Sequence, residues 1–352
     1  MGVLLLVLGV GLSEWMLTML KTREELLDKA VLYLRIYYLG MPALAIYNFG
    51  NAVYSAVGNT KKPLYYLGFS GVLNIILNLF FVIVCRMDVA GVALASIISQ
   101  YVSAVLILQA LLRSKDIYAL HPGKLRMDRE LTRDILKLGM PSGLQNVIFQ
   151  FANSFVQMGV NSFDATMVAG NSAASNADAL VYDVMAAFYT ACGSFMGQNY
   201  GAGKQERIRK GLKGAVLVSV VFCVIVSALV FVFAKPLMLL FVEAGETEII
   251  AEGVRYLHIE GAFYCGIGCL FLLYGLYRAV AKPGMSVVLT VISLGTRVVL
   301  AYLLSAVIGV TGIWWSVPIG WFLADVTGVV YYFIHKEKLL HFGESNLKRT
   351  ES

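Results

Sequence analysis

Residues 214–234 read GAVLVSVVFCVIVSALVFVFA, which is 21 consecutive residues without a charged side chain. A helix of about 20 apolar residues is long enough to span the hydrocarbon core of a bilayer. Ten such runs follow one another along the 352-residue chain. They lie near 1–20, 30–57, 64–85, 89–112, 138–160, 166–196, 212–234, 252–277, 284–307 and 310–335. The sequence therefore predicts an all-α, polytopic membrane helix bundle with ten transmembrane helices.

The composition excludes an ordinary water-soluble enzyme. Hydrophobic residues make up 59% of the chain and charged residues only 14%, whereas a soluble domain carries about 25% charged residues. The four His residues are scattered, and the sequence contains no zinc-protease motif, phosphate loop or nucleophile elbow. Cys265 and Cys269 are one helical turn apart, but no His or acid joins them at metal-ligand spacing. We expect neither an enzyme nor a metal site or organic cofactor.

The basic residues predict how the chain is oriented. Most of the 28 Lys and Arg residues lie at alternate ends of the predicted spans, and cytoplasmic loops are the ones that carry an excess of these residues. This distribution places both the N-terminus and the C-terminus in the cytoplasm. It also explains the net charge of +6 without a nucleic-acid partner. The partner expected on these grounds is the lipid bilayer.

An internal repeat relates the two parts of the chain. Tyr33-Leu34-Arg35-Ile36 matches Tyr256-Leu257-His258-Ile259 at an offset of 223, and Lys62-Pro63 matches Lys282-Pro283 at 220. The second copy begins near Leu131 with two helices that have no counterpart before the first run. The repeat therefore predicts a parent architecture of six plus six helices, of which this chain lacks the first two.

The repeat and the loops also predict the domain organisation. Because six helices are an even number, both halves have the same orientation, as in transporters built from two parallel repeats. We expect a four-helix N-terminal bundle at 1–112 and a six-helix C-terminal bundle at 135–335. A polar cytoplasmic linker at 113–134 joins them, and a cytoplasmic tail follows at 336–352.

Polar residues form a row along the predicted helix at 138–160. Asn146, Gln150, Asn153 and Gln157 are spaced by four, three and four residues, which keeps them on one face. Polar side chains inside a membrane mark either a contact between helices or a hydrated cavity. We interpret the row as a cavity lining, with helix packing alone as the alternative.

The next predicted helix repeats this spacing and adds carboxyl groups. Asn171, Ser175, Asp178 and Tyr182 share one face, and Asp183 lies on a neighbouring face. A charged group at the bilayer centre costs roughly 2.5–3.5 kcal/mol on insertion scales, so such groups face a cavity or a partner. Asp178, Asp183 and Glu260 are thus candidates for binding a cation or a proton. The alternative places Asp178 and Glu260 near external helix ends, where they would be hydrated or paired.

Four further residues have structural interpretations. Arg297 lies deep in its span and needs a counter-charge, for which Asp325 is a candidate. Trp314 and Trp315 are interpreted as residues of the aromatic belt at the membrane interface.

The segment GQNYGAGK at 197–204 resembles a motif of the multidrug and toxin extrusion (MATE) family, through Gly197, Gln198, Gly201 and Ala202. GMPSGLQN at 139–146 is similar to the start of that family's seventh helix, and GNTKKP at 58–63 to the loop after its fourth. The resemblance covers essentially the whole chain, as helices three to twelve of twelve. It implies two pseudo-symmetric bundles of the MATE/MOP type.

The resemblance also implies a function. The family exports organic cations, drugs or metabolites by alternating access in exchange for Na⁺ or H⁺, as a monomer in the plasma membrane of a bacterium. One branch uses an acidic residue in the first helix, which is missing here. Another branch uses a glutamate in the seventh helix, where this chain has Gln145, Asn146, Gln150 and Asn153. The coupling ion therefore stays open. The alternatives are a lipid-linked glycan flippase of the same superfamily and a truncated product without activity.

Overall fold

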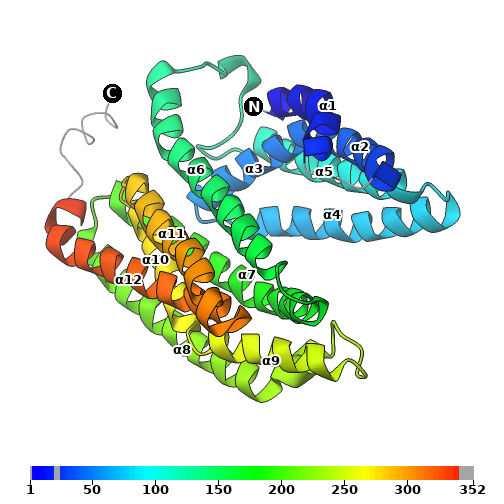
Figure 1. Ribbon diagram of the computed structural model, residues 1–352. Coiled ribbons are helices and arrows are strands. Elements are labelled where there is room, and N and C mark those ends of the chain that lie inside the picture. The colour runs from blue at the N-terminus through cyan, green and yellow to red at the C-terminus, as the bar shows by residue number, and fades with distance from the viewer. Residues whose placement is uncertain (1, 20–23, 341–352) are drawn as a thin grey trace. The chain divides into compact units, whose positions relative to one another are not determined.

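The computed structural model describes residues 2–19 and 24–340, and all regular structure in these ranges is helical (Figure 1). The all-α prediction is confirmed. The N-terminal helices are α1 (Gly2–Met19), α2 (Glu24–Leu39), α3 (Met41–Ala56), α4 (Lys61–Leu79) and α5 (Asp88–Leu112). The C-terminal helices are α6 (Arg129–Val160), α7 (Ala165–Gly201), α8 (Gln205–Met238), α9 (Thr247–Gly261), α10 (Tyr264–Ala279), α11 (Pro283–Ile308) and α12 (Val310–Leu340). A π-helical turn at Phe80–Val84 extends α4, and a short 3-10 turn occupies Pro122–Lys124.

The chain divides into two compact units. The first unit ends at Arg126 and contains α1 to α5, and the second begins at Met127 and contains α6 to α12. The division lies inside the segment that the sequence predicted as a linker. The second unit holds a long buried core, whereas the main core cluster of the first consists of Tyr47, Tyr54, Ile107 and Leu111.

Two predicted spans are bent pairs of helices. The span at 30–57 is α2 followed by α3 at an angle of 45°, and the span at 252–277 is α9 followed by α10 at 53°. Pro42 at the start of α3 has no backbone N–H to continue the preceding helix. Met41 and Tyr264, the first residues of α3 and α10, are separated by the same 223 residues that relate Tyr33 to Tyr256. The two bends therefore support the internal repeat.

These bends correct the predicted helix count. The described residues form twelve α-helices rather than ten, because a run of apolar residues does not reveal a break within it. The hypothesis that two helices are missing was drawn from the offset of 220–223 residues between the two copies and from ten spans against twelve, and the observed twelve helices do not support it.

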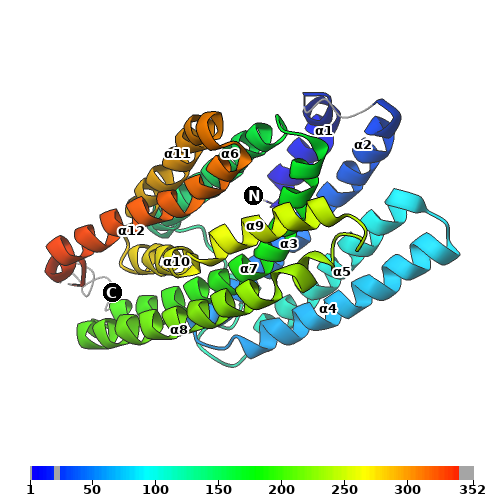
Figure 2. The same cartoon turned by 60° about the horizontal axis from the view of Figure 1, so that its bottom comes forward.

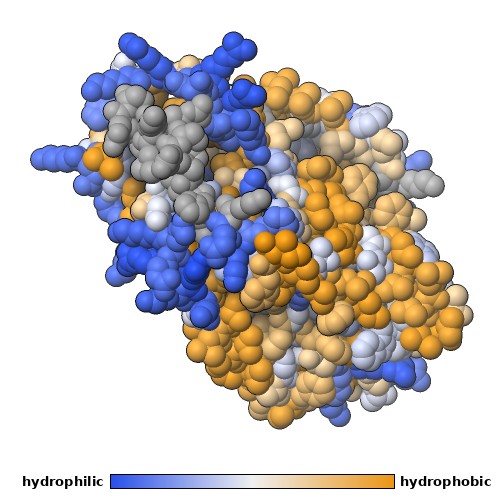
Figure 3. Space-filling view, turned by 90° about the vertical axis from the view of Figure 1, so that its left-hand side faces the viewer, coloured by the Kyte–Doolittle hydropathy of each residue, from blue (hydrophilic) through white to orange (hydrophobic). Residues whose placement is uncertain are grey.

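The helices have the length and hydropathy of membrane spans. Within the described part of the chain, seven helices are long and apolar enough to cross a bilayer, and the two bent pairs raise this number to nine. The tenth predicted span, at 138–160, lies in α6. Its row of amides lowers its hydropathy, so α6 is not among the helices that are apolar enough to cross a bilayer. Hydrophobic side chains (orange) cover much of the face seen in Figure 3. Val224 and Val232 on α8 are exposed, as expected for a surface in contact with lipid.

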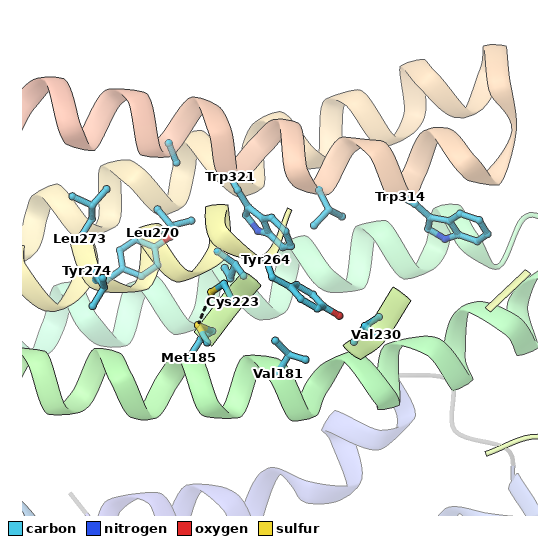
Figure 4. Packing of buried hydrophobic residues seen from close by; sticks show 14 of the residues in the cluster. Val181, Met185, Cys223, Val230, Tyr264, Leu270, Leu273, Tyr274, Trp314 and Trp321 are labelled. Carbon is cyan, nitrogen blue, oxygen red and sulfur yellow. Dashed lines mark hydrogen bonds between the residues drawn. The ribbon is translucent and has the colours of Figure 1, made fainter. Parts of the chain in front are cut away.

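The core of the C-terminal unit lies between α7, α8, α10 and α12 (Figure 4). Met185 on α7 contacts Cys223 on α8 through their sulfur atoms at 3.7 Å. Tyr264 and Trp321 reach this core from α10 and α12. These contacts hold α7 and α8, which run side by side in Figure 2, against the rest of the unit.

A single residue joins α11 to α12. Gly309 has a φ of 65°, a conformation that other L-residues rarely adopt. The chain therefore reverses between Ile308 and Val310 with no loop, and α11 and α12 pack along their lengths as a hairpin.

Candidate functional site

A cavity of about 810 Å³ lies in the C-terminal unit, with walls from α6, α7, α9, α10, α11 and α12. All ten residues that the sequence nominated for binding line it. They are Asn146, Gln150, Asn153, Gln157, Asn171, Ser175, Asp178, Tyr182, Asp183 and Glu260. The structure thus brings together residues from three helices, and their role in binding stays a prediction.

The amide row on α6 faces the cavity. Asp128 caps the start of this helix by accepting a hydrogen bond from the Leu131 backbone N–H at 2.9 Å. The helical repeat then places the four amides on one face, and all four are exposed. Asn153 accepts a hydrogen bond from Arg297 Nη1 at 3.1 Å, and Gln157 donates to Asn161 Oδ1 at 2.8 Å. Exposed amides at this depth are typical of a hydrated lining.

Gln145 is turned away from this row. It is buried, and its Oε1 accepts a hydrogen bond from Arg278 Nη2 at 2.5 Å. Arg278 also donates to the Tyr189 hydroxyl and lies 5.2 Å from the centre of that ring. Arg278 on α10 therefore ties α6, α7 and α10 together.

Two buried carboxyl groups, Asp178 and Glu260, line the cavity. Asp178 is 3% exposed and Glu260 is 1% exposed, so neither is hydrated, although Glu260 does lie in the last turn of α9. Tyr264 donates a hydrogen bond to Asp178 Oδ1 at 2.6 Å. Neither oxygen of the Glu260 carboxyl has a hydrogen-bond partner among the described residues. Asp178 and Glu260 are close enough for their charges to interact with each other.

Arg297 supplies the positive charge of the site. It lines the cavity, and its charge interacts with those of Asp178 and Glu260. The predicted pairing of Arg297 with Asp325 is wrong, because no such ion pair occurs in the described chain and the guanidinium donates to Asn153 instead. Asp325 lies beside Cys269.

Asp183 and Tyr182 complete the wall contributed by α7. Asp183 is exposed at the cavity surface. Tyr182 packs edge-on against Trp321, with ring centres 6.1 Å apart. Among the cavity residues that carry charge, three are acids and one is a base, so the cavity is acidic.

Trp314 belongs to the site, not to the membrane interface. It is 1% exposed, and its indole Nε1 donates to Asn171 Oδ1 at 3.0 Å. Its ring packs edge-on against Tyr256 at 5.7 Å. Trp315 is 37% exposed and packs against Phe263, so the belt interpretation was wrong for Trp314. The spacing of Trp314, Trp321 and Asp325 on one helical face was the signal that could have revealed it.

The motif at 197–204 lies away from the cavity. Gly197, Gln198 and Gly201 form the last turn of α7, Ala202 follows it, and none of them lines the cavity. Gly203 has a φ of 67°, which ends the helix in the left-handed conformation. The backbone N–H of Lys204 donates to the Asn199 carbonyl at 2.8 Å and closes the turn before α8. The motif therefore builds the reversal between α7 and α8.

Comparisons with known proteins place this geometry in context. The sequence model of the MatE family matches residues 1–80 and 141–303. The probable multidrug resistance protein YpnP of Bacillus subtilis is 32% identical over 326 residues, covering 92% of this chain and 72% of the relative. The probable multidrug resistance protein NorM of Thermotoga maritima is 24% identical and covers 89% and 68%.

Solved structures share the fold. The outward-facing structure of a multidrug resistance MATE family transporter of the MOP superfamily has a TM-score of 0.90 at 21% identity, covering 96% of this chain and 76% of that one. A MATE crystal structure in the bent conformation has a TM-score of 0.89. Because the family model matches more than half of the residues, and because a relative with 32% identity is covered over 72% of its length, the chain belongs to the MatE family of multi-pass membrane transporters.

Proposed function

We propose that this chain is a secondary active exporter that moves small organic cations out of a bacterial cell in exchange for Na⁺ or H⁺. It acts as a monomer in the plasma membrane with both termini in the cytoplasm, as the distribution of basic residues predicts. The observation that carries the proposal is a pair of buried carboxyl groups, Asp178 and Glu260, in a cavity that amides and aromatic rings also line.

The charges of the site support cation binding. When Asp178 and Glu260 are both ionised, they face a single guanidinium, Arg297. One negative charge is then left uncompensated in a buried place, and an uncompensated buried charge is strongly unfavourable. A single Na⁺ or proton at the Glu260 carboxyl, whose oxygens lack hydrogen-bond partners in the described chain, would balance it.

The end of α9 adds to this preference. Glu260 lies in the last turn of α9, which stops at Gly261 inside the predicted span. The C-terminus of a helix carries a partial negative charge, and such helix ends within membranes coordinate cations in other transporters. The break between α9 and α10 therefore places a second source of negative potential next to the carboxyl.

The cavity walls suit a flexible range of organic cations. Aromatic side chains line it from five helices: Phe149, Tyr182, Tyr256, Phe271 and Trp314. Ring faces attract organic cations by about 0.5–2 kcal/mol each. The volume of about 810 Å³ falls within the roughly 300–1,000 Å³ typical of sites for drug-sized ligands.

Exchange follows from competition for the same charge. A coupling cation bound at Asp178 and Glu260 removes the negative charge that attracts a cationic substrate, so the two ligands weaken each other's binding. A glycan flippase that holds an anionic lipid-linked substrate would need a cationic cavity. Three acids against one arginine favour the exporter.

The test is transport in vesicles. Purified chain reconstituted in lipid vesicles should move the fluorescent cation ethidium when a Na⁺ or pH gradient is imposed. Glu260→Gln and Asp178→Asn should each lower the gradient-driven rate by at least tenfold, since each removes one of two interacting charges. Glu248→Gln changes an exposed acid on the same helix and should leave the rate unchanged.

Three results would overturn the proposal. Ethidium flux that ignores both gradients would exclude ion-coupled exchange. A folded protein with no flux under any gradient would favour the alternative of a product without activity. Movement of a fluorescent lipid-linked glycan without any ethidium flux would favour the flippase.

A further inference from the structure

A second concave surface lies on the outside of the C-terminal unit, between α8, α10 and α12. This groove has a volume of about 920 Å³. Its apolar wall includes Leu217, Val220, Leu276 and Phe333. Leu217 is 66% exposed, and Val220 and Phe333 are also exposed. The groove thus faces the surroundings of the bundle and is separate from the acidic cavity.

Basic side chains gather at one end of the groove. Arg209, Lys210 and Lys213 come from the first turns of α8, and Lys336 comes from the last turns of α12. These four residues and Glu206 are the charged groups of the lining. The cations are therefore brought together by two helices far apart in the sequence.

Two of the four cations already have partners. Arg209 Nη2 contacts both carboxylate oxygens of Glu337 at 3.0 Å, and Lys210 Nζ lies 3.6 Å from Glu206 Oε1. Lys213 and Lys336 are exposed and have no acid within ion-pair distance in the part of the chain that is described. Their charges remain available to an anion.

On both α8 and α12, a lysine lies near the helix end and the apolar residues of the groove lie further along the helix. From Lys213 the groove follows α8 to Val220, and from Lys336 it follows α12 back to Val329. Seven residues of helix rise by roughly 10 Å, so an apolar channel of about this length extends from the two lysines toward the middle of the spans. Cys269 on α10 also lines the groove.

We propose that this groove binds one anionic glycerophospholipid, with its phosphate at Lys213 and Lys336 and an acyl chain along the wall formed by Leu217, Val220 and Phe333. Lysine binds phosphate as a point charge, and basic pockets between membrane helices bind anionic lipid headgroups. A free phosphate ion would leave the apolar wall without a partner. A zwitterionic lipid would offer the lysines no net charge.

The proposal does not depend on export, because it concerns a lipid bound outside the cavity. The alternative to a specific lipid site is that the lysines simply extend to the membrane interface, as long basic side chains do at helix ends. Such lysines would interact with any anionic surface and would not require the groove. The experiment below separates the two.

Native mass spectrometry of the full chain measures the binding. The protein is released from micelles that contain phosphatidylglycerol and phosphatidylcholine in equal amounts. The wild type should retain phosphatidylglycerol over phosphatidylcholine. Lys213→Gln/Lys336→Gln should lower this preference by roughly thirtyfold, which corresponds to about 2 kcal/mol for the loss of two charges near an anionic headgroup.

Matched controls identify the groove. Lys204→Gln/Lys282→Gln removes two exposed lysines next to α8 and α11 that do not line it, and should keep the preference. Val220→Trp fills the wall and should release the lipid with all four cations in place, whereas Val218→Trp, on an exposed position of α8 outside the lining, should not.

Three outcomes would overturn the proposal. Equal retention of the two lipids by the wild type would exclude selectivity. Equal losses in the two double-lysine variants, with no effect of Val220→Trp, would show interfacial lysines only. Displacement of the lipid by inorganic phosphate at millimolar concentration would show an anion site that does not need the acyl chain. Unchanged thermal unfolding of each variant confirms that it is folded.

Discussion

The acidic cavity and the basic groove lie in the same unit and share two helices, yet they place charge at opposite depths. In the cavity, Asp178, Glu260 and Arg297 lie inside their predicted spans, and their charges interact with one another. In the groove, Lys213 and Lys336 lie at helix ends, and the deeper wall is apolar. Helix α10 gives Phe271 to the cavity and Leu272 to the groove.

This difference shows that the depth of a charged side chain in its span determines whether it needs a neighbouring charge or a bound ion. A charge within a span must be balanced by a nearby group or by a bound ion, so it couples ion binding to the structure. A charge at a helix end is already solvated and contributes little to stability. Substitutions in the cavity should therefore have large effects and those at the groove small ones.

The largest effect is expected for Arg297→Met. This change leaves Asp178 and Glu260 without their positive neighbour, and breaking a buried charge arrangement costs about 3–5 kcal/mol. Thermal unfolding in detergent should show a strongly destabilised protein. Glu260→Gln in the same chain should recover part of the loss, and Arg255→Met, an exposed arginine on α9, serves as the control. If Arg297→Met and Arg255→Met destabilised the protein equally, the contrast between buried and exposed charges would be wrong.

Tyr264→Phe should have the next largest effect. It removes the hydroxyl that donates to Asp178 at 2.6 Å, and a hydrogen bond to a charged group contributes about 1.5–3 kcal/mol. The concentration of coupling ion that gives half-maximal transport should shift together with the unfolding temperature. Tyr302→Phe, which loses a hydrogen bond to a backbone carbonyl in an exposed setting, should shift neither by as much.

Two adjacent tryptophans provide an internal comparison of intermediate size. Trp314→Phe loses the hydrogen bond to Asn171 and should lower the free energy of unfolding by about 1 kcal/mol or more. Trp315→Phe changes a partly exposed ring and should stay within roughly 0.5 kcal/mol. If Trp315 proved the more sensitive of the two, the assignment of Trp314 to the cavity wall would be wrong.

The smallest effect is expected at the groove. Arg209→Gln breaks the exposed pair with Glu337, and such pairs contribute about 0.2–1 kcal/mol that salt screens. The unfolding temperature should fall slightly at low salt, and the difference should vanish at high salt. A loss of stability that is as large as that of Arg297→Met and independent of salt would contradict the conclusion that charges at helix ends contribute less than charges within the spans.

The sequence predicted those parts of the fold and site that depend on local pattern. The apolar runs gave the helical segments, and the spacing of Asn146, Gln150 and Asn153 placed three amides on one face because the helical period fixes it. Nothing local predicts that Tyr264 meets Asp178, since 86 residues separate them. The break at Ala262–Phe263 lacks a proline, and an apolar run looks the same with or without a bend.

The single-residue turn at Gly309 has a practical consequence for watching the transporter at work. Because α11 and α12 are joined with no loop and pack along their lengths, probes placed near Ile308 and Val310 should keep a fixed separation throughout a cycle. Spectroscopic distances from this hairpin to other helices could be calibrated against it, so the turn supplies an internal length standard.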